Sequence, residues 1–587
     1  MLPIAQNVNG KQNPALTENI SKVSFMGLEI FVAPSLRAGR RRMKDDSCQS
    51  AWVHRQGMAL LTDWYELTMM GGYFHAGRGE VRACFEYFFR ELPPHNGYAV
   101  LAGLEAFLDF YQNLRFNEDD IAYLRSTKVF DEAFLKSLSD FHPQCDIWAI
   151  PEGSVVFPYE PLIRVEGPLF EAQLLETFLL NAMNYPTLVA TKAARICAVA
   201  HPDPVIEFGL RRAQGPDGGL AGSRAAYIGG CEGTSNVLAG KYFGIPVRGT
   251  HAHSWVMSFP SELEAFRAYA KAYPQSPILL VDTYDTLTSG VPNAIRVFCE
   301  MKEAGNPQRV AIRLDSGDLA RLSKAAYDMI TSAGFDDPLI VASNELDEDL
   351  IADLKRQGAK INSWGVGTKL ITAGESPALT GIYKLVALHD GQSWQPKVKL
   401  SSNPAKTTDP GIKQPIRYFD GDGKPLGDVL YLEDASPRHA PRPQGRGYES
   451  NKPAEAGSAF ARYEETAAAM REDDHPVIPA KAGIQSKAEV ITGIDRQHFH
   501  LKRHLRGVAS QEDLLRPVVH SGQRLAPAEP LNDIRSRARR QIAALPDELK
   551  RLRNPEIYPV VLSPDLAKLK EEMLKGGLGV EGLGVRD

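Results

Sequence analysis

Two histidines that lie close together are the strongest sign of chemistry in this sequence. His251 and His253 stand two residues apart in the stretch VRGTHAHSWVMSF, after a short apolar run. On a strand, side chains two residues apart point to the same face, so the pair could bind zinc. An imidazole could also transfer a proton, accept a phosphoryl group or simply pack in the core. The pair alone leaves all four roles open.

Further metal ligands are scarce in the region that follows. Between residues 254 and 438 the only histidine is His389, which lies beyond the alternating strands and helices. The carboxylates of Asp282 and Asp285, in VDTYDT, suit Mg²⁺ better, because this ion prefers a few carboxylates together with substrate phosphates. We therefore predict that Asp282 and Asp285 bind Mg²⁺ through a bound diphosphate, whereas a zinc site lacks partners.

A glycine-rich turn is a candidate anion site. Gly365, Gly367 and Thr368 follow an apolar predicted strand in the order GVGT. Glycines allow backbone N–H groups to approach a phosphate closely, and the threonine hydroxyl adds a donor. A plain tight turn would contain the same residues, but phosphate sites in α/β barrels favour the loops after the last strands. We therefore predict phosphate binding at this turn.

Two arginines and a tyrosine could recognise a flat anion. Arg211, in EFGLRRAQGPDGG, and Arg313, in AIRLDSGDL, follow predicted strands. A buried guanidinium there could bind a carboxylate or phosphate through two hydrogen bonds, or form a salt bridge between strands. Tyr65, in LLTDWYELTMM, could stack on a planar heterocycle or pack in the core.

The elements that would position these residues alternate between strands and helices. From about residue 204, short apolar runs such as PILLVDTY alternate with amphipathic stretches such as ELEAFRAYAKAY. Repeated βα units predict a parallel sheet, either closed as a barrel or open. Seven predicted strands end in polar or glycine-rich residues, and barrel enzymes place their chemistry at that rim. The pattern therefore favours an α/β barrel.

Changes in composition divide the chain into six predicted segments. One of them, 436–512, opens rich in Pro, Gly, Ser and charge and shows no sustained period, so we expect it to bury too little surface to fold. The predicted segments are a disordered extension (1–56), an N-terminal α/β domain (57–200), an α/β barrel catalytic domain (201–400), a return segment to the smaller domain (401–435), a low-complexity insertion (436–512) and a C-terminal helical return segment (513–587).

The bulk composition excludes several classes of protein. The chain has 587 residues, of which 43% are hydrophobic and 24% charged, as in a soluble globular protein. A formal net charge of −5 offers no basic field for nucleic acid or an anionic membrane. No apolar run approaches the roughly 18 residues of a spanning helix. Six cysteines without a C-x-x-C pair indicate reduced thiols, so we predict a cytoplasmic protein. From the charge and the lack of a long apolar run, we predict that it has no nucleic-acid or membrane partner.

Seven sequence blocks together resemble nicotinate phosphoribosyltransferases. They are LLTDWYELTMMGGYF, EFGLRRAQGPDGG, YIGGCEGTSNVLAGKYFGIPVRGTHAHSWVMSF, LLVDTYDTLTSGV, IRLDSGDL, GVGTKL and KLSSNPAKTTDPGIKQ. The resemblance covers about residues 57–435 and resumes near 513–575. It implies an irregular α/β barrel, like that of type II phosphoribosyltransferases, beside a smaller α/β domain built mainly from the N-terminal region. It also implies a homodimer whose sites are completed across the subunit boundary.

The resemblance implies an activity and a role for each matching residue. Such enzymes join nicotinate to 5-phosphoribosyl 1-diphosphate, with Mg²⁺ and ATP hydrolysis, to give nicotinate mononucleotide and diphosphate in NAD salvage. By position, His253 corresponds to the phosphorylated histidine, whereas His251 has no assigned role. The implied nicotinate contacts are Tyr65, Thr250, Arg313 and Arg211; Thr368 is the implied contact to phosphoribosyl diphosphate, with Gly365 and Gly367 beside it.

Three alternative functions stay open at this point. Nicotinamide phosphoribosyltransferase is a neighbouring activity, although the blocks TDWYELTM and GLRRAQGPDGG favour the acid-specific family. A barrel metallohydrolase would use His251 and His253 as metal ligands. An inactive relative that acts as a binding or scaffold protein through its insertion would retain the motifs without forming product.

Overall fold

The computed structural model describes residues 22–25, 28–31, 58–275, 277–305, 309–437 and 489–578. The chain divides into two compact units, Met1–Ser47 and Cys48–Asp587. The described part of the first unit is an antiparallel hairpin of β1 (Lys22–Phe25) and β2 (Leu28–Phe31). The rest of the extension predicted over 1–56 lies outside the described residues.

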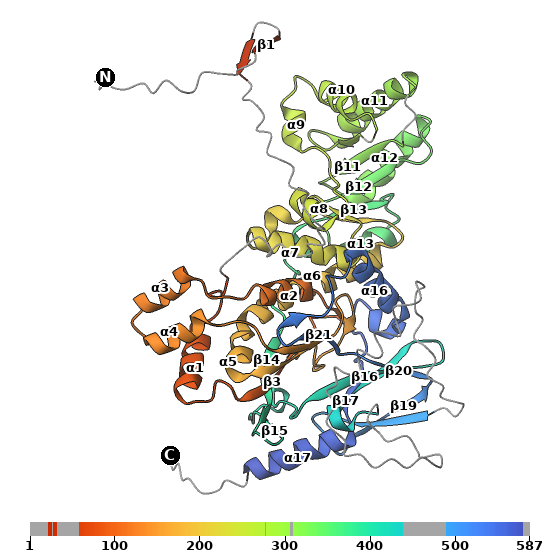
Figure 1. The fold of residues 1–587 in the computed structure, drawn as a ribbon. Coiled ribbons are helices and arrows are strands. Elements are labelled where there is room, and N and C mark those ends of the chain that lie inside the picture. The colour runs from red at the N-terminus through yellow and green to blue at the C-terminus, as the bar shows by residue number, and fades with distance from the viewer. Residues whose placement is uncertain are drawn as a thin grey trace, which may run out of the picture. The chain divides into compact units, whose positions relative to one another are not determined.

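A six-stranded parallel sheet occupies the middle of the chain (Figure 1). Each strand is short and apolar, and residues such as Ile312, Leu314 and Ile340 are fully buried beneath helices. The strands in spatial order are β10 (Ile278–Leu280), β11 (Ala311–Leu314), β12 (Leu339–Ala342), β13 (Ser363–Val366), β8 (Val205–Glu207) and β9 (Gly233–Thr234). All neighbouring pairs are parallel.

Four of the helices that connect these strands begin at side-chain caps: α8 (Val237–Phe243), α10 (Glu262–Ala272), α12 (Leu319–Ser332) and α13 (Glu348–Arg356). Asn236, Ser261, Asp318 and Asp347 each accept a hydrogen bond from the backbone N–H three residues later, which satisfies a donor that the first turn leaves free. Two further connecting helices are α7 (Gly215–Ile228) and α11 (Val291–Glu303).

The parallel sheet has two open edges, so among the described residues the closed barrel predicted from the sequence is absent. Segment 247–251 lies between edge strands β9 and β10, and Val247 forms a parallel bridge with Thr234 of β9. On the other side, the hydroxyl of Thr250 donates to the carbonyl of Ile278. The N–H of Leu280 donates to Nε2 of His251 at 3.3 Å. Side chains, instead of a backbone ladder, therefore span the gap at β10.

A seven-stranded sheet, antiparallel throughout, forms the core of the smaller domain. Its strands in spatial order are β15 (Trp394–Pro396), β14 (Gly381–His389), β3 (Arg82–Phe89), β7 (Ile163–Pro168), β5 (Asp146–Ala149), β21 (Arg516–His520) and β22 (Gln523–Arg524). Helices α1 (Trp64–His75), α2 (Leu104–Gln112), α3 (Glu118–Ser126), α4 (Glu132–Ser139) and α5 (Leu169–Leu174) belong to this domain. Two short strands, β4 (Ala99–Val100) and β6 (Val155–Val156), form a separate pair.

A third, six-stranded sheet changes the predicted segment boundaries. Its strands in spatial order are β19 (Lys502–Val508), β18 (Glu489–Ile494), β23 (Val560–Leu562), β17 (Pro425–Leu432), β16 (Lys413–Phe419) and β20 (Ser510–Asp513), and α17 (Pro564–Leu578) packs against it. Residues 489–512, predicted to belong to a low-complexity insertion, instead contain β18, β19 and most of β20, and these strands bury Ile494 and Leu505. The rest of 436–512 lies outside the described residues, apart from 436–437.

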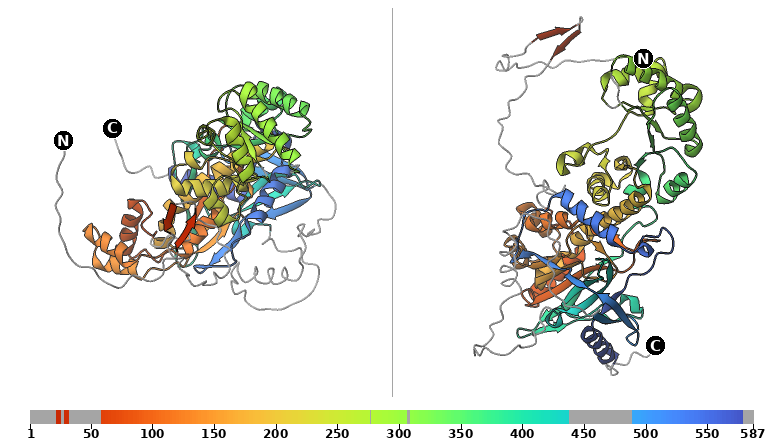
Figure 2. Two further views of the ribbon diagram at one scale, coloured as in Figure 1. Left: turned by 90° about the horizontal axis from the view of Figure 1, so that it is seen from above. Right: turned by 90° about the vertical axis from the view of Figure 1, so that its right-hand side faces the viewer.

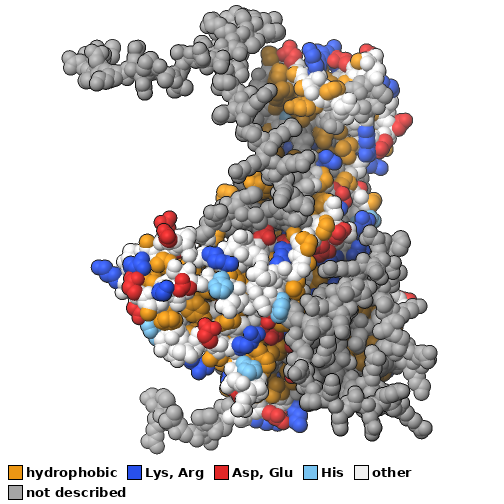
Figure 3. Space-filling view, in the orientation of Figure 1, with side chains coloured by type: hydrophobic (Ala, Val, Ile, Leu, Met, Phe, Trp, Pro, Cys, Tyr) orange, Lys and Arg blue, Asp and Glu red, His pale blue; other side chains and the backbone are white. Residues whose placement is uncertain are grey.

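The parallel sheet also ends before the predicted boundary at residue 400, because β14 already belongs to the seven-stranded sheet. Helix α6 (Glu176–Ala200) links the two regions and packs against both α7 and β14. The predicted α/β class is confirmed, while closure into a barrel is not. No described helix is long and apolar enough to cross a membrane. On the face shown in Figure 3, acidic and basic side chains of the described residues are interspersed.

Candidate active site

The carboxyl ends of the parallel strands bring several polar side chains together. Asp282 follows β10, Asp315 follows β11 and Ser343 follows β12. Because neighbouring parallel strands end at the same edge of a sheet, these side chains meet above it. Helix α9 (His253–Met257) begins beside them. We call His253, Asp282, Arg313, Asp315 and Ser343 the rim cluster.

His253 faces the carboxylates of this cluster through one ring nitrogen. Its Nε2 lies 3.7 Å from Oδ2 of Asp315 and 4.0 Å from Oδ1 of Asp282. Its Nδ1 lies 3.1 Å from the hydroxyl of Thr283. The side chain is 39% exposed, and Nε2 lies beyond hydrogen-bonding distance of both carboxylates. An accessible imidazole nitrogen of this kind is a nucleophile when neutral.

The two carboxylates have free oxygens on the side of His253. Oδ2 of Asp282 accepts hydrogen bonds from the Asp315 N–H at 2.8 Å and the Ser316 hydroxyl at 2.7 Å, whereas its buried Oδ1 has no hydrogen-bond partner in the described structure. Among the described residues no group of three His, Cys, Asp or Glu side chains could hold a metal. Two carboxylates without a third ligand suit an ion that arrives with substrate phosphates, as Mg²⁺ does.

Asp285, which the sequence predicts as the second magnesium ligand, does not join the rim cluster. Its Oδ1 accepts hydrogen bonds from the N–H groups of Leu287 and Thr288 and from the Thr288 hydroxyl at 2.6 Å. It thereby caps the π-helix η2 (Thr286–Gly290). These hydrogen bonds, led by the hydroxyl of Thr288, lower the pKa of Asp285. The structure places Asp315 beside Asp282 instead.

Arg313 is held in a fixed orientation between the rim cluster and a large cavity. Its Nε donates to the Ser343 hydroxyl at 2.8 Å, and an Nη donates to Oδ1 of Asp315 at 2.9 Å. The side chain is 12% exposed. The guanidinium carbon lies 5.7 Å from the centre of the Phe208 ring. A buried, oriented guanidinium over an aromatic ring can bind a planar carboxylate.

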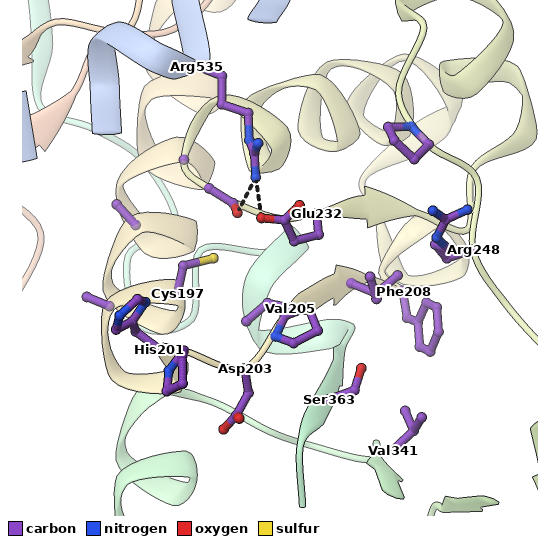
Figure 4. Close-up of a pocket in the computed structure, with 18 of the residues that line it drawn as sticks. Cys197, His201, Asp203, Val205, Phe208, Glu232, Arg248, Val341, Ser363 and Arg535 are labelled. Atoms are coloured by element: carbon purple, nitrogen blue, oxygen red, sulfur yellow. Dashed lines mark hydrogen bonds and ion pairs between the residues drawn. The ribbon is translucent and has the colours of Figure 1, made fainter. Parts of the chain in front are cut away.

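The cavity beneath Arg313 has a volume of about 1150 Å³, and Thr250 and Phe208 line it too. In Figure 4, Phe208 and Arg248 lie on one side of it and Cys197 and His201 on the other. Phe208 lies in the stretch EFGLRRAQ, and its type and spacing alone predict no role for it. The available signal was an aromatic residue directly at the end of a strand of the parallel sheet.

The GVGT turn packs closely against Phe208. A Cβ on Gly365 would lie 2.5 Å from a ring carbon of Phe208, so only glycine leaves room for this ring. Gly367 precedes the four-residue helix α14 (Thr368–Ile371), and the Thr368 hydroxyl donates to Glu345 at 3.2 Å. Arg211 is exposed in the 3-10 turn η1 (Leu210–Arg212), which packs against α14. Arg211 and Thr368 therefore lie at the same end of the sheet.

Three family models match this chain. The N-terminal domain of nicotinate phosphoribosyltransferase matches residues 60–184, the nicotinate phosphoribosyltransferase family matches 204–417, and the C-terminal domain matches 484–570. Together these ranges cover more than half of the sequence. The chain belongs to the nicotinate phosphoribosyltransferase family. The third match also includes β18 and β19, which supports their assignment to the fold.

Known members of the family are similar over most of their length. A nicotinate phosphoribosyltransferase of Bacillus subtilis (strain 168) is 48% identical over 378 residues, which cover 64% of this chain and 76% of that protein. The human nicotinate phosphoribosyltransferase is 35% identical over 574 residues, which cover 88% of this chain and 97% of that protein. The crystal structure of human nicotinic acid phosphoribosyltransferase has a TM-score of 0.70 at 32% identity, covering 87% of this chain and 99% of that one.

Tyr65, the nicotinate contact implied by the family resemblance, is not brought to the rim cluster within this chain. It lies on α1, whose buried residues Leu67 and Met70 belong to the core of the smaller domain. Helices α1 and α9 lie in separate regions of the second unit (Figures 1 and 2). The side chain of Tyr65 is exposed, at 45%. Within one chain, Tyr65 and the rim cluster therefore belong to different regions of the fold.

Glu66, next to Tyr65, makes stability dependent on pH. The residue is fully buried and accepts a hydrogen bond from Gln173 at 2.7 Å, and burial raises its pKa from 4.5 to about 7. The folded protein therefore binds this proton more tightly than the unfolded chain, and the free energy of unfolding falls as pH rises from 4.5 to about 7. We expect Glu66→Gln to raise the melting temperature at pH 8 relative to the wild type.

The control for this prediction is the same pair of proteins at acidic pH. Glutamine resembles the protonated acid, so the two melting temperatures should converge at about pH 4.5, below the folded-state pKa of Glu66. An advantage of Glu66→Gln that is equal at both pH values would show that the substitution acts by packing and not by charge.

His251 has a structural role that the sequence left unassigned. Burial lowers its pKa to about 4, which keeps the ring neutral and allows Nε2 to accept from the fully buried Leu280 N–H. We expect His251→Phe to lower the free energy of unfolding by about 1–3 kcal/mol, because this N–H would lose its acceptor. Urea unfolding at pH 7 measures the loss. A wild-type-like transition would show that the bond at β10 contributes nothing.

Proposed function

We propose that this chain joins nicotinate to 5-phosphoribosyl 1-diphosphate at the rim cluster, and that it couples the reaction to ATP hydrolysis through His253. The observation that carries this proposal is the position of Arg313. One of its hydrogen bonds points to Asp315 in the rim cluster, while its guanidinium also lines the cavity of Phe208 and Thr250. A single arginine can thus bind the acid in the cavity beside phosphates at the rim.

Nicotinate would bind at the inner end of the cavity. Its ring would stack against Phe208, and its carboxylate would accept hydrogen bonds from Arg313. Thr250 also lines the cavity, but its hydroxyl proton is already donated to Ile278, so it shapes the wall. Arg211 lies exposed at the same end of the sheet as Thr368, where it is available to either anionic substrate.

Phosphoribosyl diphosphate would bind above, where the strands end. The GVGT turn and the Thr368 hydroxyl lie there, as do the free oxygens of Asp282 and Asp315. These two carboxylates would hold Mg²⁺, which offsets the charge of the departing diphosphate. The nitrogen of nicotinate then attacks the anomeric carbon as diphosphate leaves. The residues bind and align the reactants, and no protein nucleophile is needed for this step.

ATP coupling would proceed through Nε2 of His253. Nδ1 faces the Thr283 hydroxyl, so Nε2 is the nitrogen available to attack the γ-phosphorus while ADP leaves. The phosphoryl group adds negative charge beside Asp282 and Asp315. Like charges at this distance repel, so the phosphorylated state requires a bound cation, which links ATP use to the magnesium site.

The proposal includes a homodimer and an irregular barrel. A second copy would place Tyr65 over the nicotinate ring, opposite Phe208. Segment 247–251 would act as the closing element of the barrel, and its bridge to Thr234 and its hydrogen bonds to β10 support this.

The activity is tested by measuring nicotinate mononucleotide with and without ATP, in competition with nicotinamide. We expect product from nicotinate, with a higher rate when ATP is present. Preference for nicotinamide would favour the neighbouring activity. No product together with one tightly bound zinc per chain would favour a metallohydrolase. Binding of nicotinate without turnover would favour an inactive relative.

The homodimer is tested by mixing two inactive variants. Tyr65→Ala and Arg313→Ala chains, unfolded together and refolded, form mixed dimers in which one of the two sites has both intact residues. If Tyr65 acts across the interface, equal mixing restores about a quarter of the wild-type rate. Failure to restore activity, in dimers shown to exchange, would place Tyr65 outside the shared site.

A further inference from the structure

The cavity extends well beyond the space that nicotinate needs. At about 1150 Å³ it exceeds the roughly 300–1,000 Å³ of pockets that enclose drug-sized ligands. Arg313 and Phe208 line its inner end. The lining continues along the sheet to residues that precede strands, among them Asp203 before β8 (Figure 4) and Arg309 before β11. The cavity therefore has a second end, on the side opposite the rim cluster.

Basic side chains surround this second end. Helix α16 (Leu531–Ala544) contributes Arg535 and Arg539, and Lys550 follows it. The two carboxylates in the lining are already paired, since Asp203 accepts from Lys355 at 3.1 Å and Glu232 from Arg535 at 2.8 Å. Lys550 pairs with Asp547 at 2.9 Å, so Arg539 is left as the cation of α16 in this lining with no carboxylate partner among the described ion pairs, and it gives the outer end a positive charge.

One hydrogen-bond donor and one charge at this end are free for an anion. The Nε of Arg535 is buried and has no hydrogen-bond partner in the described part of the chain. Arg539 is exposed on the next turn of α16 and lines the same opening. Between this opening and Arg313, the apolar side chains of Ile278 and Leu339, which are in register with Ala311, line the wall. A path with charged ends and an apolar middle suits a small aromatic carboxylate.

We propose that nicotinate enters the site through this basic opening, separately from the phosphorylated substrates, which bind at the rim cluster. This inference rests on the proposed function. Phosphoribosyl diphosphate and ATP carry several negative charges and would fill the rim with phosphate and Mg²⁺. A second anion would be repelled from that side, whereas the basic opening raises its local concentration. Nicotinate can then bind after the rim is occupied.

The experiment preloads the full-length protein with phosphoribosyl diphosphate and MgATP, then mixes it rapidly with labelled nicotinate. The slope of the observed rate against nicotinate concentration gives the association rate constant. Equilibrium dialysis with labelled nicotinate alone gives the dissociation constant. Ala198→Trp narrows the opening, because Ala198 is exposed and lines the cavity. Arg539→Glu reverses one charge there, and Arg540→Glu, exposed on the same helix but outside the lining, is the matched control.

An entrance has a kinetic signature that a binding site lacks. For Ala198→Trp we expect the association rate constant to fall by about fivefold or more, while the dissociation constant changes less than about twofold. A narrower entrance slows association and dissociation of nicotinate by the same factor, so their ratio is unchanged. For Arg539→Glu we expect slower association at low salt, with the difference fading at high salt. Arg540→Glu should match the wild type.

Three outcomes would overturn the proposal. If association is unchanged in both variants, nicotinate enters from the rim. If Ala198→Trp weakens equilibrium binding as much as association, the opening is a binding site and not a path. If Arg540→Glu slows association as much as Arg539→Glu, net charge alone is responsible. A wild-type protein that forms no nicotinate mononucleotide would instead refute the proposed function.

Discussion

His253→Ala removes acid-labile phosphate from protein incubated with labelled ATP, and with it the acceleration that ATP gives to product formation. Nε2 of His253 is the accessible nitrogen of the rim cluster, and alanine leaves no nucleophile there. Transfer without ATP should continue more slowly, because Arg313, Phe208 and the two carboxylates are untouched. We expect kcat/KM for phosphoribosyl diphosphate in the presence of ATP to fall by about 10–100-fold.

The companion substitution at His251 separates phosphorylation from stability. His251→Phe should lower stability while retaining phosphate incorporation in the protein that stays folded. His253→Ala should unfold like the wild type, because the ring is partly exposed and packs little. Phosphate incorporation that survives His253→Ala would place the acceptor elsewhere and remove the basis for ATP coupling proposed here.

The sequence predicted that His251 and His253 are candidate functional residues, but it did not predict which of them is buried. The stretch GTHAHS identified both as candidates, but only packing could divide their roles. The ring of His251 contacts Tyr269 edge-on, with ring centres 4.6 Å apart, and its Nε2 accepts a hydrogen bond from the N–H of Leu280 in β10. His253 begins a helix and faces solvent and carboxylates. The residues were predictable from type and spacing, whereas their burial depended on segment 247–251 lying against β10.

Other differences between the predictions and the structure also arise from the contacts that each residue makes in the fold. A parallel sheet was predictable from repeated βα units, but closure depends on hydrogen bonds at one edge, which strand periodicity does not record. Asp315 and Asp285 looked equivalent as carboxylates after strands, yet one faces His253 and the other caps a helix. Strand β19 escaped prediction because exposed residues outnumber buried ones in it and the two kinds do not alternate along the strand.

The family resemblance and the structure identify different residues of the proposed nicotinate site. The resemblance implied roles for Tyr65, Thr250 and Thr368 that no contact within this chain tests. The structure adds Phe208 as a residue that lines the cavity, and its ring fits against Gly365 because glycine has no Cβ. It also showed that Arg313 shares its charge with Asp315. This pairing alters the expected strength of substrate selection, because Arg313 is not left without a partner when nicotinate is absent.

Arg313→Ala has the second large expected effect, a fall in kcat/KM for nicotinate of about 10³-fold, or about 4 kcal/mol, because it truncates one partner of a buried, hydrogen-bonded charge pair. Arg313→Lys should lose less, since it keeps the charge but not the fork that matches a carboxylate. Arg321→Ala, at an exposed position on α12, is the control and should behave like the wild type.

Nicotinamide distinguishes recognition of the acid from a purely structural role of Arg313. If Arg313 binds the carboxylate of nicotinate, removing it should cost the neutral amide much less, and the preference for nicotinate over nicotinamide should narrow by about 100-fold. Asp315 would add to this narrowing, because its unpaired carboxylate repels the carboxylate of nicotinate and can accept a hydrogen bond from the amide of nicotinamide. Equal losses for the acid and the amide would mean that Arg313 acts by holding Asp315 and Ser343 in place, and nicotinate would then have to be recognised elsewhere in the cavity.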